Sequence, residues 1–189
     1  VDAKSTGWGQ ETETLIHDWH ISGIAMSPDG KLLVASGSGG FSIWRLNGSG
    51  HWELRLSQPG EGNRCVAASP DGRMIAVATA GKSIQIWDLG SMTRVAELRD
   101  LRDDLRRIEY SPDGRYLAAS TFDGRFGVWR LRKGESPVRL ENLPDSVQNY
   151  TFTLDGSHLV VARWGDEHKD LVVWDIESGR ESLRLSNNA

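Results

Sequence analysis

The sequence predicts an all-β protein built from four repeated units, each a four-stranded antiparallel sheet. The first observation is a turn sequence that recurs every 42 residues: Ser-Pro-Asp-Gly at 27–30, 69–72 and 111–114, and Thr-Leu-Asp-Gly at 153–156. The second is that the runs of β-branched, aromatic and aliphatic residues between these turns alternate with a period of two and show no sustained helical period. A fixed repeat of about 20 to 50 residues indicates one structural unit used several times.

The turn sequence itself favours a type I turn. Proline at the second position presets φ near about −65°, and glycine at the fourth position accepts the exit geometry. The fourth copy keeps the polar turn residues and has Leu154 in place of proline. We therefore expect the same turn in all four units.

Composition places the chain among globular proteins and argues against several function classes. With 189 residues, 38% of them hydrophobic and 25% charged, the chain is long enough to bury a core. It has no run of about 18 apolar residues, so we expect no membrane segment. Its net charge of −4, without a basic cluster, argues against nucleic-acid partners.

The single cysteine and the start of the chain bear on location. Cys65 has no second cysteine for an internal disulfide, and its place inside a hydrophobic run predicts a small buried hydrophobic residue in a reducing compartment. We therefore expect a cytoplasmic protein. The chain starts at Val1 rather than Met and shows no signal-peptide pattern, which predicts a piece of a longer protein.

The chain begins with a polar stretch at 1–11 that we expect to be a flexible leader. From residue 12 onward the pattern is that of strands. The stretch 12–17 is expected to be a spare outer strand that precedes four units, at about 18–58, 59–100, 101–142 and 143–186. The charged stretch 98–107 comes nearest to a helical turn, but its register with the other repeats argues against one.

The first run of each unit alternates larger apolar residues with small or polar ones, which predicts one buried face. Its apolar positions are in register at a spacing of 42 residues: Ile24 and Met26, Val66 and Ala68, Ile108 and Tyr110, Tyr150 and Phe152. The second run is nearly continuously apolar at its centre, as in a strand covered on both faces: 32–36, 74–79, 116–121 and 158–163.

The third run ends in a tryptophan in every unit: 41–44, 84–87, 126–129 and 171–174. A more polar fourth run carries one leucine per unit, which is typical of an exposed edge strand: Leu56, Leu98, Leu140 and Leu185. Both faces of such a sheet carry apolar residues, so each unit needs neighbours. Four-stranded sheets packed face to face around an axis form a β-propeller.

These units resemble the repeats of the WD40 family. The resemblance rests on the strand that leads into Ser-Pro-Asp-Gly and on third strands that close in Trp-Asp at 87–88 and 174–175, and it covers residues 12–186. It implies a propeller of four-stranded blades. TolB-like propellers, which share the turn but usually carry a tyrosine in a third strand preceded by a longer hairpin, are the alternative.

The chain departs from the WD40 pattern in two ways. Two third strands close in Trp-Arg, at Arg45 and Arg130, and only His17 holds the family's histidine position. The family's buried hydrogen-bonded set of His, Ser or Thr, Trp and Asp is therefore incomplete in every unit. The resemblance implies three members in the first unit, His17, Ser36 and Trp44, and three in the third, Ser120, Asp123 and Trp129.

The sequence carries no catalytic or cofactor-binding pattern, so it predicts neither an enzyme nor a cofactor nor a metal site. Among five histidines only His17 and His20 have a metal-ligand spacing, and a structural or solvent role is favoured for both. The acidic turn at 166–170 is expected to be solvated rather than to hold a hard cation. The glycines at 37–40 lack the following helix and lysine of a phosphate-binding loop.

The resemblance implies a non-catalytic scaffold that binds protein partners on the face where the fourth-to-first and second-to-third connections emerge. That face is expected to carry the starts of the first strands and the residue before each second turn: Ser22, Arg64, Arg106, Arg107, Gln148, Asn149, Phe122 and Trp164. Arginine beside an exposed aromatic residue is the composition of a binding hot spot. In the other interpretation the aromatics fold over neighbouring strands and the arginines pair with Asp103, Asp104 or Glu109.

Four units leave the ring unfinished. Propellers of this family usually close with about seven or eight units, so a four-unit arc exposes an apolar face at each end. We expect the arc to be half of a seven- or eight-bladed ring, completed by another chain or by a second copy. Two identical arcs leave two spare strands, so a different fragment fits the strand count slightly better.

An alternative function is a site for a small ligand, or a hydrolase site, in the central channel. Such a site needs polar side chains that converge on the channel from the first strands. Only Arg64, Arg107 and Glu109 offer them.

Overall fold

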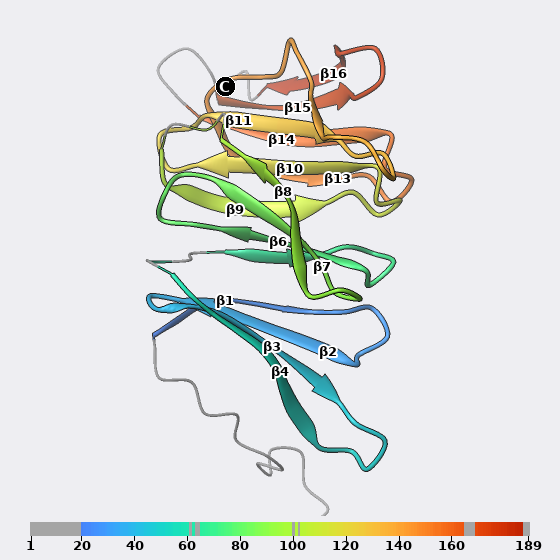
Figure 1. The fold of residues 1–189 in the computed structure, drawn as a ribbon. Helices are drawn as coiled ribbons and strands as arrows, with labels where there is room; N and C mark the ends of the chain where they lie inside the picture. Colours follow the sequence, from blue (N-terminus) through green and yellow to red (C-terminus); the bar gives the residue numbers. More distant parts are fainter. Residues whose placement is uncertain are drawn as a thin grey trace, which may run out of the picture.

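The computed structural model describes residues 20–60, 62, 65–99, 101, 103–164 and 169–186. In this part of the chain the secondary structure consists of strands β1 to β16, so the all-β prediction is confirmed (Figure 1). These residues contain no helix with the length and hydropathy needed to span a membrane. The expected leader at 1–11 and the expected spare strand at 12–17 lie outside the described residues.

The strands form four antiparallel sheets, or blades, each pairing its strands in sequence order. Blade 1 contains β1 (Ile21–Met26), β2 (Leu32–Gly37), β3 (Gly40–Leu46) and β4 (Trp52–Pro59). Blade 2 contains β5 (Val66–Ala68), β6 (Met74–Ala78), β7 (Ile84–Asp88) and β8 (Thr93–Leu98). Blade 3 contains β9 (Leu105–Tyr110), β10 (Tyr116–Thr121), β11 (Phe126–Arg130) and β12 (Val138–Arg139). Blade 4 contains β13 (Val147–Phe152), β14 (His158–Trp164), β15 (Lys169–Asp175) and β16 (Arg180–Ser186).

The outer strand of blade 3 is shorter than the repeat pattern predicts. Strand β12 has only two residues and ends before Leu140. The Leu140 amide still donates to the Val128 carbonyl at 2.8 Å, which continues the ladder for one bond. The expectation that 98–107 is not helical is confirmed in its described part: Leu98 ends β8, Leu105 begins β9, and the described residues between them lie in no helix or strand.

The repeated turn makes the same hydrogen bonds in all four blades. In blade 1 the Gly30 amide donates to the Ser27 carbonyl at 2.9 Å. Ser27 Oγ donates to Asp29 Oδ1 at 2.6 Å and accepts from the Leu32 amide at 2.9 Å. In blade 4 Thr153 replaces the serine, and its hydroxyl makes the same 2.6 Å bond to the turn aspartate. Interactions within a few residues therefore build each hairpin independently of the neighbouring blades.

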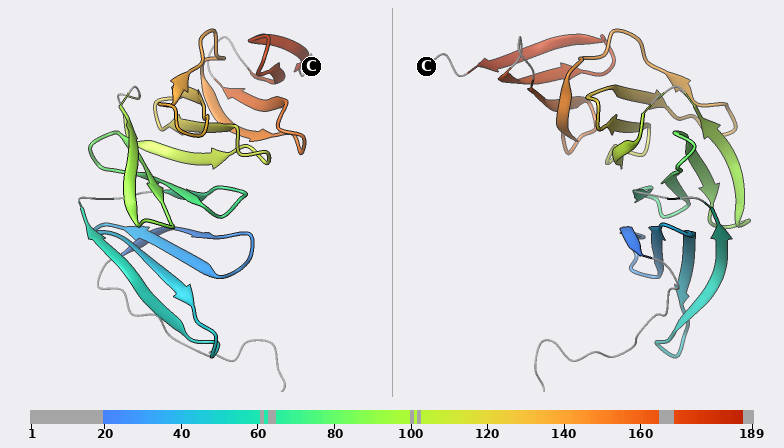
Figure 2. Two further views of the ribbon diagram at one scale, coloured as in Figure 1. Left: turned by 45° about the vertical axis from the view of Figure 1, so that its right-hand side comes forward. Right: turned by 90° about the vertical axis from the view of Figure 1, so that its left-hand side faces the viewer.

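The four blades stack face to face along a curve that does not close on itself (Figures 1 and 2). The first strand of each blade lies on the inside of this curve and the fourth strand lies on the outside (Figure 2). This arrangement is that of a propeller arc with four blades, as the sequence predicts.

Three apolar clusters fill the three junctions between successive blades. We call the two faces of a blade its forward face, which packs on the next blade, and its rear face, which packs on the preceding one. At the first junction the forward face of blade 1 meets the rear face of blade 2 through Leu32, Val34, Phe41 and Ile43 on one side and Val66, Ile75, Val77 and Leu89 on the other. The other two junctions are built from equivalent positions.

The predicted burial of one face of the first strand is confirmed in the later blades and is wrong in blade 1. Ile108 and Tyr150 are 7% and 3% exposed at this position. At the same position of blade 1 Ile24 is 71% exposed, and Met26, two residues on, is 52% exposed. The reason is that the described residues place no blade behind the rear face of blade 1.

The hydrogen-bonded set in blade 3 differs by one residue from the implied set. Ser120 Oγ is buried without a hydrogen-bond partner among the described residues. Thr121 Oγ1 instead donates to Asp123 Oδ1 at 2.5 Å. Successive side chains of a strand point to opposite faces, so Thr121 shares the rear face with Leu117 and Trp129, whereas Ser120 lies on the forward face.

The set implied for the first unit is also not formed as expected. His17 lies outside the described residues. Ser36 Oγ donates to the Gly23 carbonyl at 3.5 Å. Ser36 pairs with Phe41 and so lies on the forward face, opposite to Trp44.

Candidate protein-interaction surface

The candidate residues gather where the inner strands of blades 3 and 4 lie side by side. Arg106 Nη1 on β9 donates to Gln148 Oε1 on β13 at 2.9 Å. The next residues repeat the contact, because Arg107 Nη1 donates to Asn149 Oδ1 at 2.8 Å. Each pair joins equivalent positions 42 residues apart, so two arginines and two amides form two parallel rows across the junction.

The two arginines differ in charge balance. Arg107 Nη2 also forms an ion pair with Glu109 Oε2 at 2.8 Å, which confirms part of the prediction that the arginines pair with nearby acids. Arg106 is exposed, and its hydrogen bond to Gln148 goes to a neutral amide. A guanidinium that faces an amide keeps its positive charge available to an incoming carboxylate or phosphate.

Each of the two blades joined by these rows also carries an exposed aromatic residue at the end of its second strand. Phe122 and Trp164 are 55% and 63% exposed, so neither is folded away into the core. The Phe122 amide donates to the Asp104 carbonyl, and the Trp164 amide donates to the Ser146 carbonyl, both at 3.1 Å. These backbone bonds hold each aromatic residue beside the start of the first strand of its own blade. We call Arg106, Arg107, Phe122, Gln148, Asn149 and Trp164 the rim surface.

The remaining two predicted residues do not join the rim surface. Ser22 is exposed on β1, two blades away along the arc. Arg64 lies outside the described residues. At the position of Phe122 and Trp164, blade 1 has Ser38, whose amide makes the equivalent bond to the His20 carbonyl at 3.1 Å. The aromatic character is therefore confined to one half of the arc.

A buried ion pair supports the hairpin that carries Trp164. Arg163 is 9% exposed, and its Nε and Nη2 donate to the two carboxylate oxygens of Asp170 at 2.9 and 2.8 Å. This bond to Asp170 raises the pKa of Arg163. Arg184 Nη1 approaches the same carboxylate at 3.4 Å. The sequence predicts a solvated acidic turn at 166–170. This prediction is wrong for Asp170, which lies in β15 and accepts both hydrogen bonds from Arg163. Residues 166–168 lie outside the described part of the chain.

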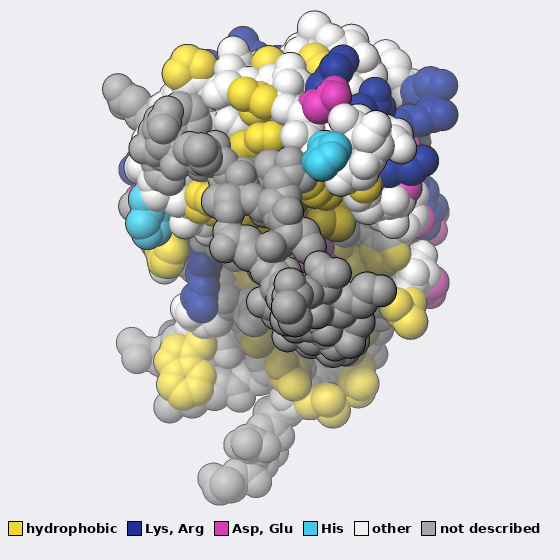
Figure 3. Space-filling model, turned by 90° about the horizontal axis from the view of Figure 1, so that it is seen from below, with side chains coloured by type: hydrophobic (Ala, Val, Ile, Leu, Met, Phe, Trp, Pro, Cys, Tyr) yellow, Lys and Arg dark blue, Asp and Glu magenta, His cyan; other side chains and the backbone are white. Residues whose placement is uncertain are grey.

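Exposed apolar side chains also lie at the two ends of the arc, on blade 1 and on blade 4. On the blade 1 end face, defined as Ile24, Met26 and Leu33, the first two residues are more than half exposed. Figure 3 views the molecule from this end and shows hydrophobic side chains at the surface. The blade 4 end face is the forward face of that blade and comprises Leu171, Val173, Leu183 and Leu185. Exposed apolar side chains are therefore found at both ends of the described arc, whereas Trp44 and Ala35, on the same face of blade 1 as Ile24, are 6% and 4% exposed.

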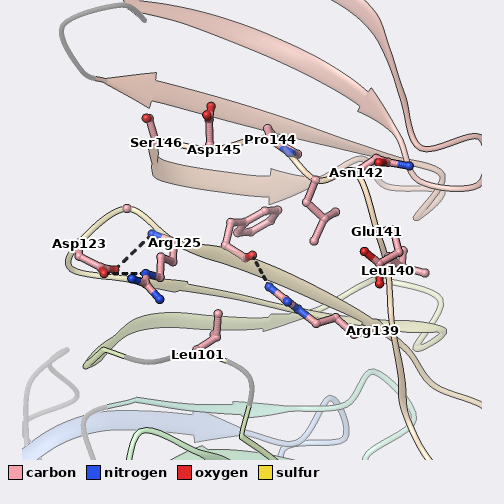
Figure 4. Close-up of a pocket in the computed structure, with 13 residues that line it drawn as sticks. Leu101, Asp123, Arg125, Arg139, Leu140, Glu141, Asn142, Pro144, Asp145 and Ser146 are labelled. Carbon is pink, nitrogen blue, oxygen red and sulfur yellow. Dashed lines mark hydrogen bonds and ion pairs between the residues drawn. The ribbon is translucent and has the colours of Figure 1, made fainter.

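A pocket of about 630 Å³ lies at blade 3, away from the inner strands (Figure 4). Its walls are β11, β12 and the connection to blade 4. Arg139 Nη2 donates to the Phe126 carbonyl at 3.3 Å, and Arg125 Nε pairs with Asp123 Oδ2 at 2.9 Å. The hydroxyl of Thr121 lowers the pKa of Asp123 and keeps it ionised. Asp123 and Arg125 thus pair with each other at the pocket wall, and Arg139 binds a backbone carbonyl.

The described residues show no arrangement for catalysis at the central channel. Of the three candidates there, Arg64 lies outside the described residues. Arg107 and Glu109 form an ion pair, and Thr151 Oγ1 donates to Glu109 Oε1 at 3.4 Å. Burial raises the pKa of the Cys65 thiol to about 12, so the thiol stays protonated at neutral pH and is a poor nucleophile. No group of three or more His, Cys, Asp or Glu in this part of the chain is placed to hold a metal ion.

Comparisons with known proteins agree with this architecture. The family model described as WD domain, G-beta repeat (WD40) matches residues 9–45, 57–88 and 95–130, more than half of the chain. Among solved structures, the chain is similar to the β-propeller domain of Cps50 (Swd1) from Myceliophteria thermophila, with a TM-score of 0.74 and 21% sequence identity. That match covers 90% of this chain and 56% of the other, so this chain spans a little over half the length of that structure. At this identity the likeness shows the fold.

Proposed function

Because this chain belongs to the WD40 repeat family, we propose that it is a non-catalytic scaffold whose rim surface binds a protein partner. The proposal includes that its arc is completed by another chain or by a second copy, and that it works in the cytoplasm. Propellers of this family generally serve as protein-interaction scaffolds. The observation that carries the proposal is the pair of exposed aromatics, Phe122 and Trp164, each held beside the start of one of the two first strands that the arginine and amide rows join.

The chemistry of the rim surface defines the kind of partner. Phe122 and Trp164 offer exposed aromatic area, which supplies most of the energy of a protein interface when it is buried. Arg106 offers a positive charge whose hydrogen bond goes to a neutral amide. We infer a partner segment that presents an acidic group next to an apolar side chain.

The test is affinity capture with matched variants of the whole chain. Proteins captured by the unmodified chain are compared with those captured by Phe122→Ala, Trp164→Ala and the double variant. Leu154→Ala is the control, because Leu154 is 95% exposed on a turn outside the rim surface. Circular dichroism verifies that each variant is folded.

We expect one partner to be captured by the unmodified chain and by the control, and to be lost with the double variant. For the purified partner, an aromatic hot spot corresponds to affinity weaker by about 30-fold or more. Retention of every captured protein by the double variant would contradict the proposal. Loss of small-molecule binding with unchanged capture would favour the channel function instead.

A further inference from the structure

The outer edge of blade 3 is open at a point where the other three blades are closed. At the position three residues before the third-strand tryptophan, each of those blades has an outer-strand partner: Phe41 pairs with Gln58, Ile84 with Leu98, and Leu171 with Leu185. The equivalent residue of blade 3 is Phe126. Within the described part of the chain it has no outer-strand partner, because β12 pairs only with Trp129 and Arg130.

The cause is a displacement of β12 by two residues along β11. Leu140 and Leu98 hold the same position in the repeat, 42 residues apart. Leu98 pairs with Ile84, three residues before the tryptophan, whereas the Leu140 amide bonds to the carbonyl of Val128, one residue before it. The outer strand of blade 3 therefore leaves the sheet before it reaches Phe126.

The pocket of about 630 Å³ lies beside this open edge (Figure 4). Its apolar lining comes from both blade connections and from the two strands: Leu101, Phe126, Leu140, Leu143 and Pro144. In blade 2 the equivalent place holds the side chain of Leu98, which is 7% exposed in the junction with blade 3. The pocket therefore has the lining for a leucine side chain, and its volume leaves room for the backbone that would carry one.

Arg139 supplies the charge at this edge. Its Nη2 donates to the Phe126 carbonyl at 3.3 Å, and its side chain is exposed. A carbonyl on an open strand edge is the natural acceptor for the N–H of an added strand. Arg139 pairs with Trp129, so a residue added opposite Gly127 would lie on the same face as Arg139, two positions further along. A guanidinium there favours a carboxylate on that residue.

We propose that this pocket binds an extended segment of a protein partner in which an acidic residue precedes a leucine. The leucine enters the apolar pocket, its backbone N–H replaces Arg139 at the Phe126 carbonyl, and the carboxylate pairs with the released guanidinium. The chain itself uses this pair of residues in blade 2, where Glu97 and Leu98 lie opposite Gln85 and Ile84. The site is separate from the rim surface, so the inference goes beyond the proposed function and does not depend on it.

The experiment is an NMR titration of the isotope-labelled 189-residue chain with a synthetic peptide, acetylated and amidated, that has the sequence of residues 96–99, Ala-Glu-Leu-Arg. A second peptide has alanine in place of the leucine, and a third has lysine in place of the glutamate. We expect saturable shifts of backbone amides that line the pocket, such as those of Gly124, Phe126 and Ser146. The alanine peptide is expected to bind about tenfold more weakly, because it buries less apolar area.

Arg139→Glu tests the charge. Arg139 is exposed, so the variant is expected to fold, which circular dichroism verifies. It is expected to bind the glutamate peptide about tenfold more weakly and to prefer the lysine peptide. Arg139→Gln, which keeps a hydrogen-bond donor without the charge, is expected to lie between. Lys133→Glu is the control, because Lys133 is exposed in the loop before β12 and does not line the pocket; it is expected to leave the affinity unchanged.

A titration without saturable shifts at the pocket would overturn the inference. So would equal affinity for the leucine and alanine peptides, or unchanged affinity of Arg139→Glu for the glutamate peptide. The double variant of Phe122→Ala and Trp164→Ala is expected to keep peptide binding, since neither residue lines the pocket. Loss of binding in that variant would place the peptide on the rim surface and would also overturn the inference. Partner capture through the rim surface is measured separately, so either proposal can fail while the other stands.

Discussion

Equivalent positions at an internal junction and at an end of the arc carry similar residues and bury them to very different extents. Ile84 on blade 2 and Leu171 on blade 4 both stand three residues before the third-strand tryptophan. Ile84 is 1% exposed and Leu171 is 44% exposed. Whether one of these side chains is buried therefore depends on the presence of a neighbouring blade, and it cannot be predicted from the strand pattern of a single repeat.

The turns show the same difference at a smaller scale. A methyl group added at Gly156 would meet the Asp113 carboxylate of the preceding blade at 2.7 Å. At Gly30, whose φ of +68° is nearly the same, nothing lies within 4 Å. The same local turn thus has a neighbour only where a described blade precedes it, and that neighbour is closest at Gly156.

The largest expected effect separates junction from end face. Replacing Ile84 by Ala leaves a cavity in a filled junction and is expected to lower the free energy of unfolding by about 2 to 5 kcal/mol. Replacing Leu171 by Ala is expected to cost less than about 1 kcal/mol at concentrations where the chain is monomeric, because much of that side chain is already in water. Urea denaturation at low protein concentration measures both. Equal losses would remove the distinction between the two regions.

The second effect separates the turns. Gly30→Ala is expected to cost about 1 to 2 kcal/mol, because an L-residue is strained at positive φ. Gly156→Ala carries the same strain and also displaces the Asp113 side chain from its bond with Ser111, which adds about 1 kcal/mol. The difference between the two urea midpoints is the measured quantity. A Gly156 variant no less stable than the Gly30 variant would show that the turns do not interact.

The third effect is a loss of stability in acid that arises in the turns of blades 1 and 4. The Thr153 hydroxyl lowers the pKa of Asp155, and the Ser27 hydroxyl lowers that of Asp29, below the ordinary value of 3.8. A carboxyl with a depressed pKa in the folded state stabilises the fold above its unfolded pKa, and this contribution is lost as pH falls through the folded pKa. The urea concentration at which half of the protein is unfolded is expected to decrease as the pH is lowered from about 5 to about 2. Asp155→Asn is expected to lose less over this range than the unmodified chain, and an equal or larger loss would count against the turn as the source.

The smallest expected effect is an increase in stability. Leu154→Pro restores the proline found at the same position of the other three turns, where the backbone already has turn geometry. We expect the variant to be more stable by about 0.4 to 1 kcal/mol, because proline restricts the unfolded chain. The reverse change, Pro112→Leu, is expected to lose a similar amount. A destabilised Leu154→Pro variant would show that blade 4 bends its turn differently.

Much of the fold could be predicted because each repeat is built from short-range patterns. The turn residues, the period-two alternation and the third-strand tryptophans place nearly all strands to within a few residues. The shortness of β12 could not be predicted, because Leu140 keeps its position in the repeat although it lies outside the two-residue strand.

The composition of the candidate site and its contacts between equivalent positions of adjacent blades could be predicted, whereas contacts within a blade could not. Repeat register alone places Arg106 beside Gln148 and Arg107 beside Asn149, since equivalent residues of adjacent blades must be neighbours. The exchange of Ser120 for Thr121 in the hydrogen-bonded set was missed, because only the sheet register shows which of two adjacent hydroxyls shares a face with Trp129. Arg163 gave no signal in the sequence, since its burial depends on Asp170, seven residues later.

By itself the sequence determined the repeated unit: four hairpin turns held by the hydrogen bonds of Ser or Thr, Asp and Gly, and strands whose alternation is a local property. The tertiary structure decided which apolar faces leave water and how the curve of blades ends. Ile24 and Tyr150 occupy the same position in their repeats, yet only Tyr150 has a blade packed against it. Hydrophobic burial requires a second surface, and the position of that surface is fixed only when the blades stack.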